Sequence, residues 1–584
     1  MNKWIKYTFL TITFLASSWA LFFPGFFRVH DFTHAARIVE MTQALKEGHF
    51  PVRWTQDFGY GYGMPLFEFY APLPFYLGSF FYSLGLDVVL VIKILFALCS
   101  VGVMIGAYKL ANELFNDERS AVLVAAATTL APYRSVNLYV RGALSEAWAI
   151  TFIPWILLGL VLLIKKSPRA WLVMTLSTTG LMLSHNLTTM IFLPISLVFF
   201  SSLILIELAS KRMELVTAAK IIFKAVGSYT LAIGLAAFYL LPAFLEKDFT
   251  KVDQSVINDY FNFNLHFLYI RQFLVASWGY GGSAWGVDDG ISFFLGWGQL
   301  AALLAFPIYL LIKGYKLQKK KFGKQDFIAV FGIKLSPELI RSVVFLGLLC
   351  FSLFMSLLKS QAIWQQIPLF KYIQFPWRWL SVSLVFLGLL QPYLLEVFEK
   401  EKIKKAVFYL LLIGSLANVI FFKPETFLSD PSGFYYTDRA LIRRQMSDIL
   451  QDYIPIAMSP VNQIEPVYQL VLSVDKEPQQ YQVAIDQSHQ KLIQTNFSNT
   501  TTLNLGLASF PGWKAELDGE EIELKTSPDG NYQLDVPKGS HLVGIIFGST
   551  LLRSVADTIS AISLIILVWF NLPSLINQKK IIHD

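Results

Sequence analysis

Charged residues and cysteines are scarce in this 584-residue chain. Asp, Glu, Lys and Arg make up only 15% of it, 54% of the residues are hydrophobic, and the mean hydropathy is +0.50. Uncharged runs near the length of a bilayer span recur along the chain, which excludes an ordinary water-soluble domain and indicates a polytopic membrane protein. Cys99 and Cys350, the two cysteines, both fall inside apolar runs, so disulfides and zinc-cysteine sites are not expected.

Twelve apolar runs are predicted to cross the membrane as helices. The first, residues 7–27, is followed by no small-residue cleavage pattern and indicates a retained signal anchor. Residues 120–133 and 171–183 are shorter than the roughly 20 residues that a spanning helix needs, so their boundaries are the least certain. The other runs are 88–110, 147–164, 187–208, 221–244, 291–312, 342–358, 380–395, 406–422 and 555–576.

Loop charge favours twelve spans over thirteen. With twelve, every lysine cluster falls on one side, which the positive-inside rule makes cytoplasmic, together with both termini. Residues 72–86 then form a surface or re-entrant segment on the outer face, as Pro72 and Pro74 allow. The formal charge of +7 needs no nucleic-acid partner, because the lysine-rich turns explain much of it. These turns contain Lys3 and Lys6, Lys165, Lys166 and Arg169, Lys211 and Arg212, Lys319 to Lys321 and Lys324, Lys402, Lys404 and Lys405, and Lys579 and Lys580.

This topology predicts three parts. Residues 1–422 form a membrane domain with a first outer loop at 28–87, residues 423–554 form an extracytoplasmic domain, and residues 555–584 form a last span and a cytoplasmic tail. The second half of the extracytoplasmic domain alternates apolar and polar residues at 503–507, 520–524 and 542–547. Asp518-Gly519 and Asp529-Gly530 are typical turn signals. We therefore expect a mainly α membrane protein with a small β-rich C-terminal domain.

The outer loops carry several motifs. The first span ends at His30-Asp31, which precedes a predicted surface helix from Phe32 to Glu47. Aromatic and glycine-rich segments follow at 58–67 (FGYGYGMPLF) and 70–74 (YAPLP). Further motifs are PYR at 132–134, RGALSE at 141–146, QFPWRW at 374–379, FPGWK at 510–514 and DG at 518–519. The alternating Gly59, Gly61 and Gly63 lack the spacing of a P-loop or a dinucleotide fingerprint, so nucleotide binding is not indicated.

Together these motifs resemble the GT-C superfamily of membrane glycosyltransferases. Within it they are most similar to the bacterial pyruvoyl-tetrahydropterin-synthase-related membrane proteins and the related YfhO-like proteins, although no pterin chemistry is evident. The resemblance implies transfer of a hexosyl or pentosyl unit from a polyprenyl-phosphate carrier to a glycan, lipid or protein acceptor at the outer face of a bacterial plasma membrane. The alternative is a non-catalytic protein on the same scaffold that binds or carries lipid-linked glycan in envelope assembly.

Asp31 is the predicted catalytic residue. The resemblance implies an acidic general base or metal ligand in the first outer loop, and Asp31 is the matching position. Inverting sugar transfer independently requires a carboxylate that takes the proton of the acceptor hydroxyl. The alternative is that Asp31 caps the surface helix, where Asp is a preferred residue.

Two histidines near Asp31 raise the question of a divalent cation. On a helix His34 would neighbour both His30 and Asp31. His30 and His34, with Glu146 from the next outer loop, are candidate metal ligands, as in some metal-dependent relatives. The simpler interpretation, which we favour, is that the histidines bind headgroups or Asp31 itself.

Arginine is concentrated in the predicted outer loops, whereas the cytoplasmic loops mostly use lysine. Guanidinium groups bind phosphate oxygens bidentately, which suits a polyprenyl phosphate. Arg141 and Arg378 are the leading candidates for this contact. Arg37 and Arg53 are further substrate-binding candidates, with His34 and Glu146. Lipid headgroups or acidic partners such as Glu40, Glu68 and Glu146 are the alternative partners of these arginines.

Aromatic residues in the same loops could stack on the apolar faces of sugars. Trp54 and Tyr70 are the candidates carried forward, with Tyr60, Tyr62 and Trp377. The alternative is the interfacial aromatic belt of any membrane protein. His185-Asn186, between two predicted spans, is interpreted as a turn or packing pair and only secondarily as a ligand.

Overall fold

The computed structural model describes residues 1–257, 259–319, 328–330, 333–432, 436–474 and 480–581. Two compact units make up the chain, each assembled from segments that are distant in the sequence. Unit 1 contains Met1–Asp31, Lys93–Ala232 and Asp259–Asp430, and unit 2 contains Phe32–Ile92, Ile233–Asn258 and Pro431–Asp584. Most of the first outer loop therefore belongs to the same unit as the C-terminal β domain.

Unit 1 is a helical bundle built around α17 (Leu380–Leu395), in which every residue is buried. Three helices that pack against α17 are α6 (Glu118–Thr129), α14 (Trp297–Lys319) and α15 (Pro337–Ser356). Because α17 is apolar all round and enclosed by other helices, its burial forms the centre of the hydrophobic core. The other long helices are α1 (Lys3–Ser18), α5 (Val88–Phe115), α8 (Leu144–Ile164), α9 (Ala170–Met182), α10 (Asn186–Ala209), α11 (Leu215–Leu245) and α18 (Glu401–Leu416), with α5 and α11 each crossing from one unit into the other.

Short elements connect these helices. The helical ones are α7 (Pro132–Ser135), a π-helix at Val136–Val140, α13 (Ile270–Leu274), α16 (Gln361–Gln366) and a 3-10 helix at Pro376–Trp379. The strands are β1 (Phe26–Phe27), which pairs with β4 (Phe427–Leu428), and β2 (Ile328–Val330), which pairs with β3 (Ile333–Leu335).

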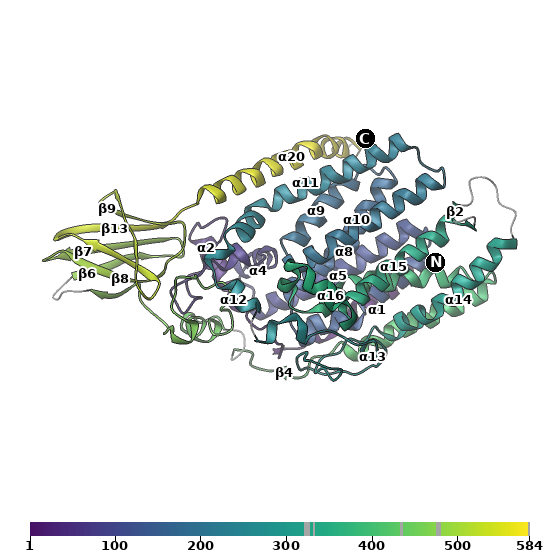
Figure 1. The fold of residues 1–584 in the computed structure, drawn as a ribbon, viewed down its shortest axis with the longest axis horizontal. Coiled ribbons are helices and arrows are strands. Elements are labelled where there is room, and N and C mark those ends of the chain that lie inside the picture. The colour runs from purple at the N-terminus through teal and green to yellow at the C-terminus, as the bar shows by residue number, and fades with distance from the viewer. Residues whose placement is uncertain (258, 320–327, 331–332, 433–435, 475–479, 582–584) are drawn as a thin grey trace. The chain divides into compact units, whose positions relative to one another are not determined.

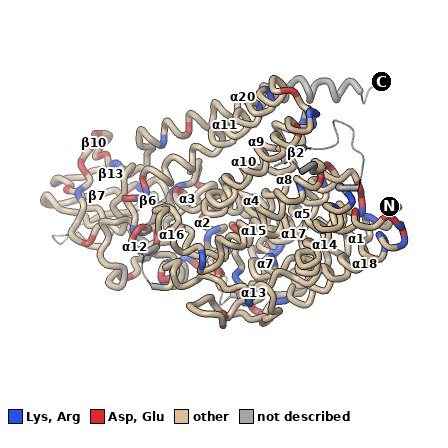
Figure 2. The backbone as a smooth tube through the Cα atoms, turned by 45° about the vertical axis from the view of Figure 1, so that its right-hand side comes forward, with Lys and Arg blue, Asp and Glu red and all other residues tan. Residues whose placement is uncertain are grey.

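Ten helices among the described residues are long and apolar enough to cross a membrane. Two of the twelve predicted spans are not among them, because α6 and α9 have only 12 and 13 residues. Helices of that length extend about 18–20 Å, which is less than a hydrocarbon core of about 30 Å. Residues 72–86 contain α4 (Leu73–Ser83), whose 11 residues are likewise too short to span. Figure 2 shows long uncharged stretches in the helices, with charged residues gathered near helix ends.

Of the predicted positive-inside clusters, those at 165–169 and 211–212 lie in described turns, whereas Lys3 and Lys6 lie in α1, residues 402–405 in α18, and Lys579 and Lys580 in the helix Leu551–Ile581. Lys6 pairs with Glu118, and Lys165 pairs with Glu113, at 2.7 and 2.8 Å. Lys319 is the last residue of α14, whereas Lys320, Lys321 and Lys324 lie outside the described residues.

Unit 2 combines short helices with two antiparallel sheets. The first outer loop forms α2 (His34–Lys46), α3 (Leu66–Phe69) and α4, and α12 (Val252–Ile257) follows α11. One sheet has the order β10-β9-β13-β7-β6 and the other β11-β12-β8-β5 (Figure 1). The strands are β5 (Val471–Val474), β6 (Gln480–Asp486), β7 (Gln490–Phe497), β8 (Thr501–Ala508), β9 (Trp513–Leu517), β10 (Glu520–Ile522), β11 (Lys525–Thr526), β12 (Asn531–Val536) and β13 (Gly539–Phe547).

The alternating pattern of the C-terminal domain is confirmed as strands. Residues 503–507 fall in β8, 520–522 in β10 and 542–547 in β13. Asp518 and Gly519, with φ of 52° and 92°, form the turn between β9 and β10, as a two-residue hairpin requires. Only Gly548, Ser549 and Thr550 separate β13 from α20 (Leu551–Ile581), so the sheet runs almost directly into the last long helix.

Candidate functional site

Asp31 is held in unit 1 by the backbone of a neighbouring segment. The N–H of His30 donates to the carbonyl of Val140 at 3.1 Å, and the N–H of Asp31 donates to that of Arg141 at 2.8 Å. A Cβ on Gly142, which has φ of 64°, would lie 2.6 Å from Cγ2 of Val29. This close approach requires glycine. Gly142 therefore lets residues 140–142 pack against residues 29–31.

Glu146 is the centre of a buried polar cluster. Its Oε2 lies 2.7 Å from Nη1 of Arg141 and 3.6 Å from Nε of Arg378, and its carboxylate side chain is 1% exposed. Its Oε1 accepts a hydrogen bond from Oη of Tyr133 at 2.6 Å and a longer one from Nδ2 of Asn137 at 3.4 Å. One carboxylate thus orients two guanidinium groups that lie more than 200 residues apart in the sequence.

The π-helix at Val136–Val140 supports this cluster. Its wide turn brings Asn137 under Arg141, whose Nη1 donates to Oδ1 of Asn137, and the backbone N–H of Arg141 donates to the carbonyl of Val136. Single π-helical turns are often found at functional sites. The sequence did not indicate Tyr133 and Asn137 as members of this cluster, because no spacing rule marks a π-helix, although Tyr133 lies in the PYR motif.

Arg378 is oriented by its own loop. Its Nη1 donates to the carbonyl of Ile373 at 2.6 Å and to Oε1 of Gln374 at 3.1 Å, and its guanidinium lies 4.9 Å from the ring centroid of Phe375. Trp377 instead faces Arg141, at 4.7 Å. Phe375 is therefore a cation-π partner of Arg378, and Trp377 of Arg141.

His185 belongs to the same neighbourhood. Burial and the charge of Arg378 lower its pKa to about 3, against the opposing effects of Glu146 and Asp31. Its Nδ1 lies 2.8 Å from Oγ1 of Thr188, and it also accepts from the N–H of Thr188 as the N-cap of α10. His185 is thus a neutral helix cap, which confirms the interpretation as a turn residue while placing it beside the arginines.

The electrostatics of Arg141 connect the cluster with Asp31. Burial acts to lower the pKa of Arg141, but Glu146 and Tyr133, with a contribution from Asp31, raise it. Formally, Arg141 and Arg378 carry two positive charges and Glu146 one negative charge. The Asp31 carboxylate is near enough to contribute to the pKa of Arg141, and guanidinium groups held in this way can stabilise negative charge that develops near Asp31.

The predicted helical spacing of His30, Asp31 and His34 is wrong. Helix α2 begins only at His34, with Thr33 in the N-cap position, so His30 and Asp31 precede the helix and share no helical face with His34. Asp31 is likewise not the N-cap residue itself. The ring of His30 bonds the carbonyl of Tyr280 through Nε2 at 2.7 Å.

The other predicted substrate-binding residues lie in unit 2. The guanidinium of Arg37 lies 4.0 Å from the ring centroid of Tyr70, and the ring of His34 lies 6.2 Å from that of Phe75. Arg53 pairs with Asp557 of α20 at 2.6 Å. Trp54 is buried against the rings of Phe510, Trp513 and Phe547. Arg37 and Tyr70 are thus brought together, whereas Arg53 and Trp54 make contacts within unit 2 that stabilise its fold.

Comparison with known proteins identifies the family. Residues 67–423, more than half of the chain, match the model of a membrane-protein family described as a 6-pyruvoyl-tetrahydropterin synthase related domain. This chain belongs to that family. An uncharacterized protein of Lactococcus lactis subsp. cremoris (strain MG1363) is 29% identical over 279 residues, which cover 45% of this chain and 44% of that protein. The match therefore spans less than half the length of this relative.

Two solved structures are similar to the chain at low identity. An arabinofuranosyltransferase AftD from Mycobacteria is 15% identical with a TM-score of 0.40, and the match covers 72% of this chain and 26% of AftD. The Archaeoglobus fulgidus oligosaccharyltransferase in its apo form is 13% identical with a TM-score of 0.43, and the match covers 72% of this chain and 56% of the enzyme. At these scores the likeness defines neither the activity nor the substrate of this chain.

Proposed function

We propose that this membrane protein is a glycosyltransferase that moves a sugar from a polyprenyl-phosphate carrier to an envelope acceptor at the outer membrane face. The observation that carries the proposal is the buried pair of guanidinium groups on Glu146, with Asp31 held beside Arg141. A lipid-linked phosphate needs cations near the membrane, and sugar transfer needs a carboxylate close to the reacting atoms. Unit 1 supplies both within one group of residues.

In the proposed reaction Asp31 takes the proton from the acceptor hydroxyl. The hydroxyl oxygen then attacks the anomeric carbon, and the bond from that carbon to the phosphate oxygen breaks, with inversion. The electron pair of the broken bond leaves with the polyprenyl phosphate. Arg141 and Arg378 stabilise the charge of this leaving group, while Glu146 and Tyr133 hold the guanidinium groups in place.

In unit 1 the candidate ligand Glu146 does not suit a divalent cation. Glu146, a candidate ligand, has its carboxylate against Arg141 and Arg378, whose charges oppose the approach of a metal ion. Among the residues that the structure describes, no group of three His, Cys, Asp or Glu side chains is arranged to hold a metal. We therefore propose that Arg141 and Arg378 stabilise the phosphate.

The proposal includes a location and an orientation. The protein lies in a bacterial plasma membrane with both termini in the cytoplasm, and residues 423–554 lie on the outer side with the long outer loops. The distribution of lysine and arginine between the predicted loops supports this orientation.

The test is turnover by the purified protein in lipid nanodiscs. Radiolabelled polyprenyl-phosphate hexoses and pentoses are supplied with envelope glycan, and transfer of label and release of polyprenyl phosphate are followed together. We expect both products in equal amounts. Saturable binding of the lipid without release of polyprenyl phosphate would instead support the non-catalytic carrier.

A further inference from the structure

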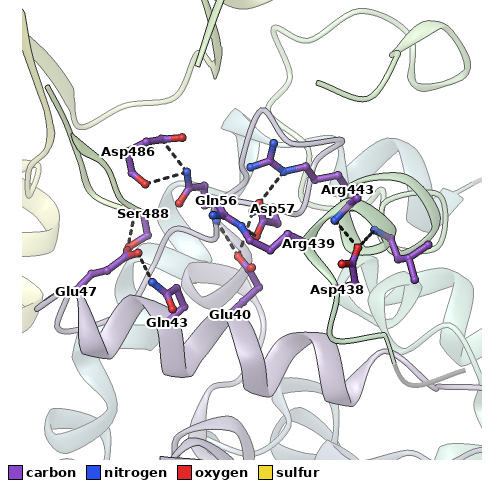
Figure 3. Close-up of polar contacts among 12 residues, drawn as sticks. Glu40, Gln43, Glu47, Gln56, Asp57, Asp438, Arg439, Arg443, Asp486 and Ser488 are labelled. Atoms are coloured by element: carbon purple, nitrogen blue, oxygen red, sulfur yellow. Dashed lines mark hydrogen bonds and ion pairs between the residues drawn. The ribbon is translucent and has the colours of Figure 1, made fainter. Parts of the chain in front are cut away.

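Two features outside the Glu146 cluster have chemistry that the proposed reaction does not use. One is a buried charge cluster in unit 2, in which the carboxylate of Asp57 binds Arg439 and Arg443 at 2.7 Å each (Figure 3). These groups bind one another and join the first outer loop to the segment before β5, so their role is structural. The other is the exposed indole of Trp285 in unit 1.

Trp285 lies in a tight hairpin that begins at Tyr280 and ends at Ile291, which face each other in an antiparallel bridge. The N–H of Gly281 donates to the carbonyl of Gly290 at 2.8 Å. A Cβ on Gly290 would lie 2.8 Å from Cα of Gly281, so glycine allows the two strands to approach this closely. Backbone contacts thus close the hairpin at its base.

The tip of the hairpin, residues 284–288, is held in shape by Asp289. Oδ1 of Asp289 accepts a hydrogen bond from the N–H of Ala284 at 2.7 Å, and Oδ2 accepts one from Nε2 of Gln272 in α13. Both carboxylate oxygens therefore fix the backbone that carries Trp285. The indole is held in one place without being packed into the core.

The base of the hairpin contacts the segment that ends at Asp31. Nε2 of His30 lies 2.7 Å from the carbonyl oxygen of Tyr280 and donates a hydrogen bond to it. His30 directly precedes Asp31, the proposed general base. The hairpin therefore begins next to the proposed reaction site.

A second contact connects the tip with the guanidinium groups of that site. Oγ of the buried Ser283 accepts a hydrogen bond from Nε1 of Trp377 at 3.0 Å, and the ring of Trp377 lies 4.7 Å from the guanidinium of Arg141. Two residues extend at most about 7 Å, so Cα of Trp285 lies within that distance of Cα of Ser283. Trp285 therefore lies at the edge of the proposed reaction site.

The tip offers the two kinds of surface that a sugar needs. Trp285 is 62% exposed, and no ring among the described residues packs against its indole. Asp288, three residues further on, is also exposed. An indole supplies a flat apolar face, and a carboxylate accepts hydrogen bonds from hydroxyl groups. A pyranose ring has an apolar C–H face and a rim of hydroxyl groups, so it can use both side chains.

The charge of the tip favours an uncharged ligand over a lipid headgroup. Asp288 and Asp289 make no ion pair with a cation in the part of the chain that the structure describes. Two carboxylates repel the phosphate groups of membrane lipids and of a polyprenyl-phosphate donor. Tryptophans that anchor a protein in the bilayer interface are instead commonly accompanied by lysine or arginine.

From this arrangement we infer that the hairpin tip binds an uncharged sugar of the acceptor, which is therefore a glycan. Trp285 stacks on one face of the sugar, and Asp288 accepts hydrogen bonds from its hydroxyl groups. The inference rests on the proposed function and reduces its possible acceptors from a glycan, lipid or protein to a glycan. Both side chains position the acceptor, while Asp31 takes its proton.

The first test measures binding of neutral tetrasaccharides of glucose, galactose, mannose and N-acetylglucosamine to the full-length protein in lipid nanodiscs, by saturation-transfer NMR. We expect saturable binding of at least one. Trp285→Ala should weaken it about three- to tenfold, the usual effect of losing an aromatic contact, and Trp285→Phe should keep most of it. Trp4→Ala, the same change at an exposed tryptophan of α1, is the matched control and should bind normally.

Transfer assays separate this inference from the proposed function. With radiolabelled donor, Trp285→Ala should raise the KM for the glycan acceptor about three- to tenfold and leave kcat and the KM for the donor unchanged. Unchanged acceptor KM in this variant, or binding of none of the four tetrasaccharides, would overturn the inference. Tetrasaccharide binding that depends on Trp285, without turnover by the natural chain, would refute the proposed function and leave the glycan site in place.

A last measurement tests the bilayer as the alternative partner of the indole. In nanodiscs that contain brominated phosphatidylcholine, tryptophan emission of the natural chain should be quenched no more strongly than that of Trp285→Phe. Stronger quenching of the natural chain would place Trp285 in lipid and overturn the inference.

Discussion

At the scale of single residues, Asp31 tests the proposed chemistry. Asp31→Asn keeps the shape of the side chain but cannot accept the proton of the acceptor hydroxyl. We expect transfer to fall about 10²- to 10⁴-fold, the usual contribution of a general base. Asp535→Asn, in an exposed pair with Lys525, is the control and should keep full turnover. Near-normal transfer by the Asp31 variant, measured with radiolabelled donor, would remove Asp31 from the chemistry.

Arg378 tests how the phosphate is bound. Arg378→Lys keeps the charge but loses the planar fork, so donor affinity should fall while acceptor affinity stays unchanged. Arg378→Ala should cost more, on the order of 1.5–3 kcal/mol for a charged hydrogen bond. Direct binding of labelled polyprenyl-phosphate sugar measures both variants. Arg271→Ala, an exposed arginine of α13, is the control. Lower thermal stability with unchanged donor affinity would show that Arg378 serves only to hold its loop on Phe375.

At the scale of secondary-structure elements, the N-cap residue His185 makes the stability of the folded protein depend on pH at the start of α10. Its pKa is about 3 in the folded protein and about 6.5 in the unfolded chain, so the unfolded chain binds the proton first as the pH falls. Stability is therefore lost progressively from about pH 6.5 towards pH 3, by at most about 1.4 kcal/mol per pH unit. His185→Asn keeps a capping acceptor that does not titrate.

The expected result is a smaller loss of melting temperature on acidification for His185→Asn than for the natural chain. Differential scanning fluorimetry between pH 7 and pH 4 measures it. His541→Asn is the control, because His541 is half-buried and its hydrogen bond to Asp518 raises its pKa. An identical acid dependence in the natural chain and the His185 variant would argue against this cap as an acid-sensitive contact.

Helix α20 begins with a buried ion triad. Nε of Arg553 lies 3.1 Å from Glu68 and 2.8 Å from Glu246, and the side chain of Arg553 is 0% exposed. Arg553→Met leaves two buried acids without their cation, and we expect a loss of about 3–5 kcal/mol. Lys525→Met, which breaks an exposed pair, should cost about 0–1 kcal/mol. Equal melting temperatures for the two variants would contradict a stabilising role for the triad.

At the scale of the whole molecule, loop charge predicts the orientation. A reporter that is active only in the cytoplasm should be active when it is fused within Lys319 to Lys324 and silent when it is fused near Ser527. Alkaline phosphatase, which is active only outside, should give the reverse pattern at both positions. The opposite results would overturn the proposed orientation without affecting the fold.

Local patterns in the sequence predicted much of the fold but less of the site. Hydropathy located ten of the long helices, and alternation with Asp-Gly turns located strands of the β domain, because both signals depend on neighbouring residues. The group of Tyr133, Glu146 and Arg378 depends on helix packing across more than 200 residues, and no local pattern encodes it. The helical spacing of His30, Asp31 and His34 was predicted wrongly, because it depends on which residue begins α2. Helix ends are the feature that sequence patterns predict least accurately.

The junction between β13 and α20 has a consequence for the freedom of the C-terminal sheet. Its three linking residues allow at most about 13–14 Å between the Cα atoms of Phe547 and Leu551. A junction this short acts as a hinge and not as a tether, because it permits a change of angle at the end of β13 but no independent diffusion of the strand away from α20. Anything bound to the sheet would therefore share the lateral motion of the last helix.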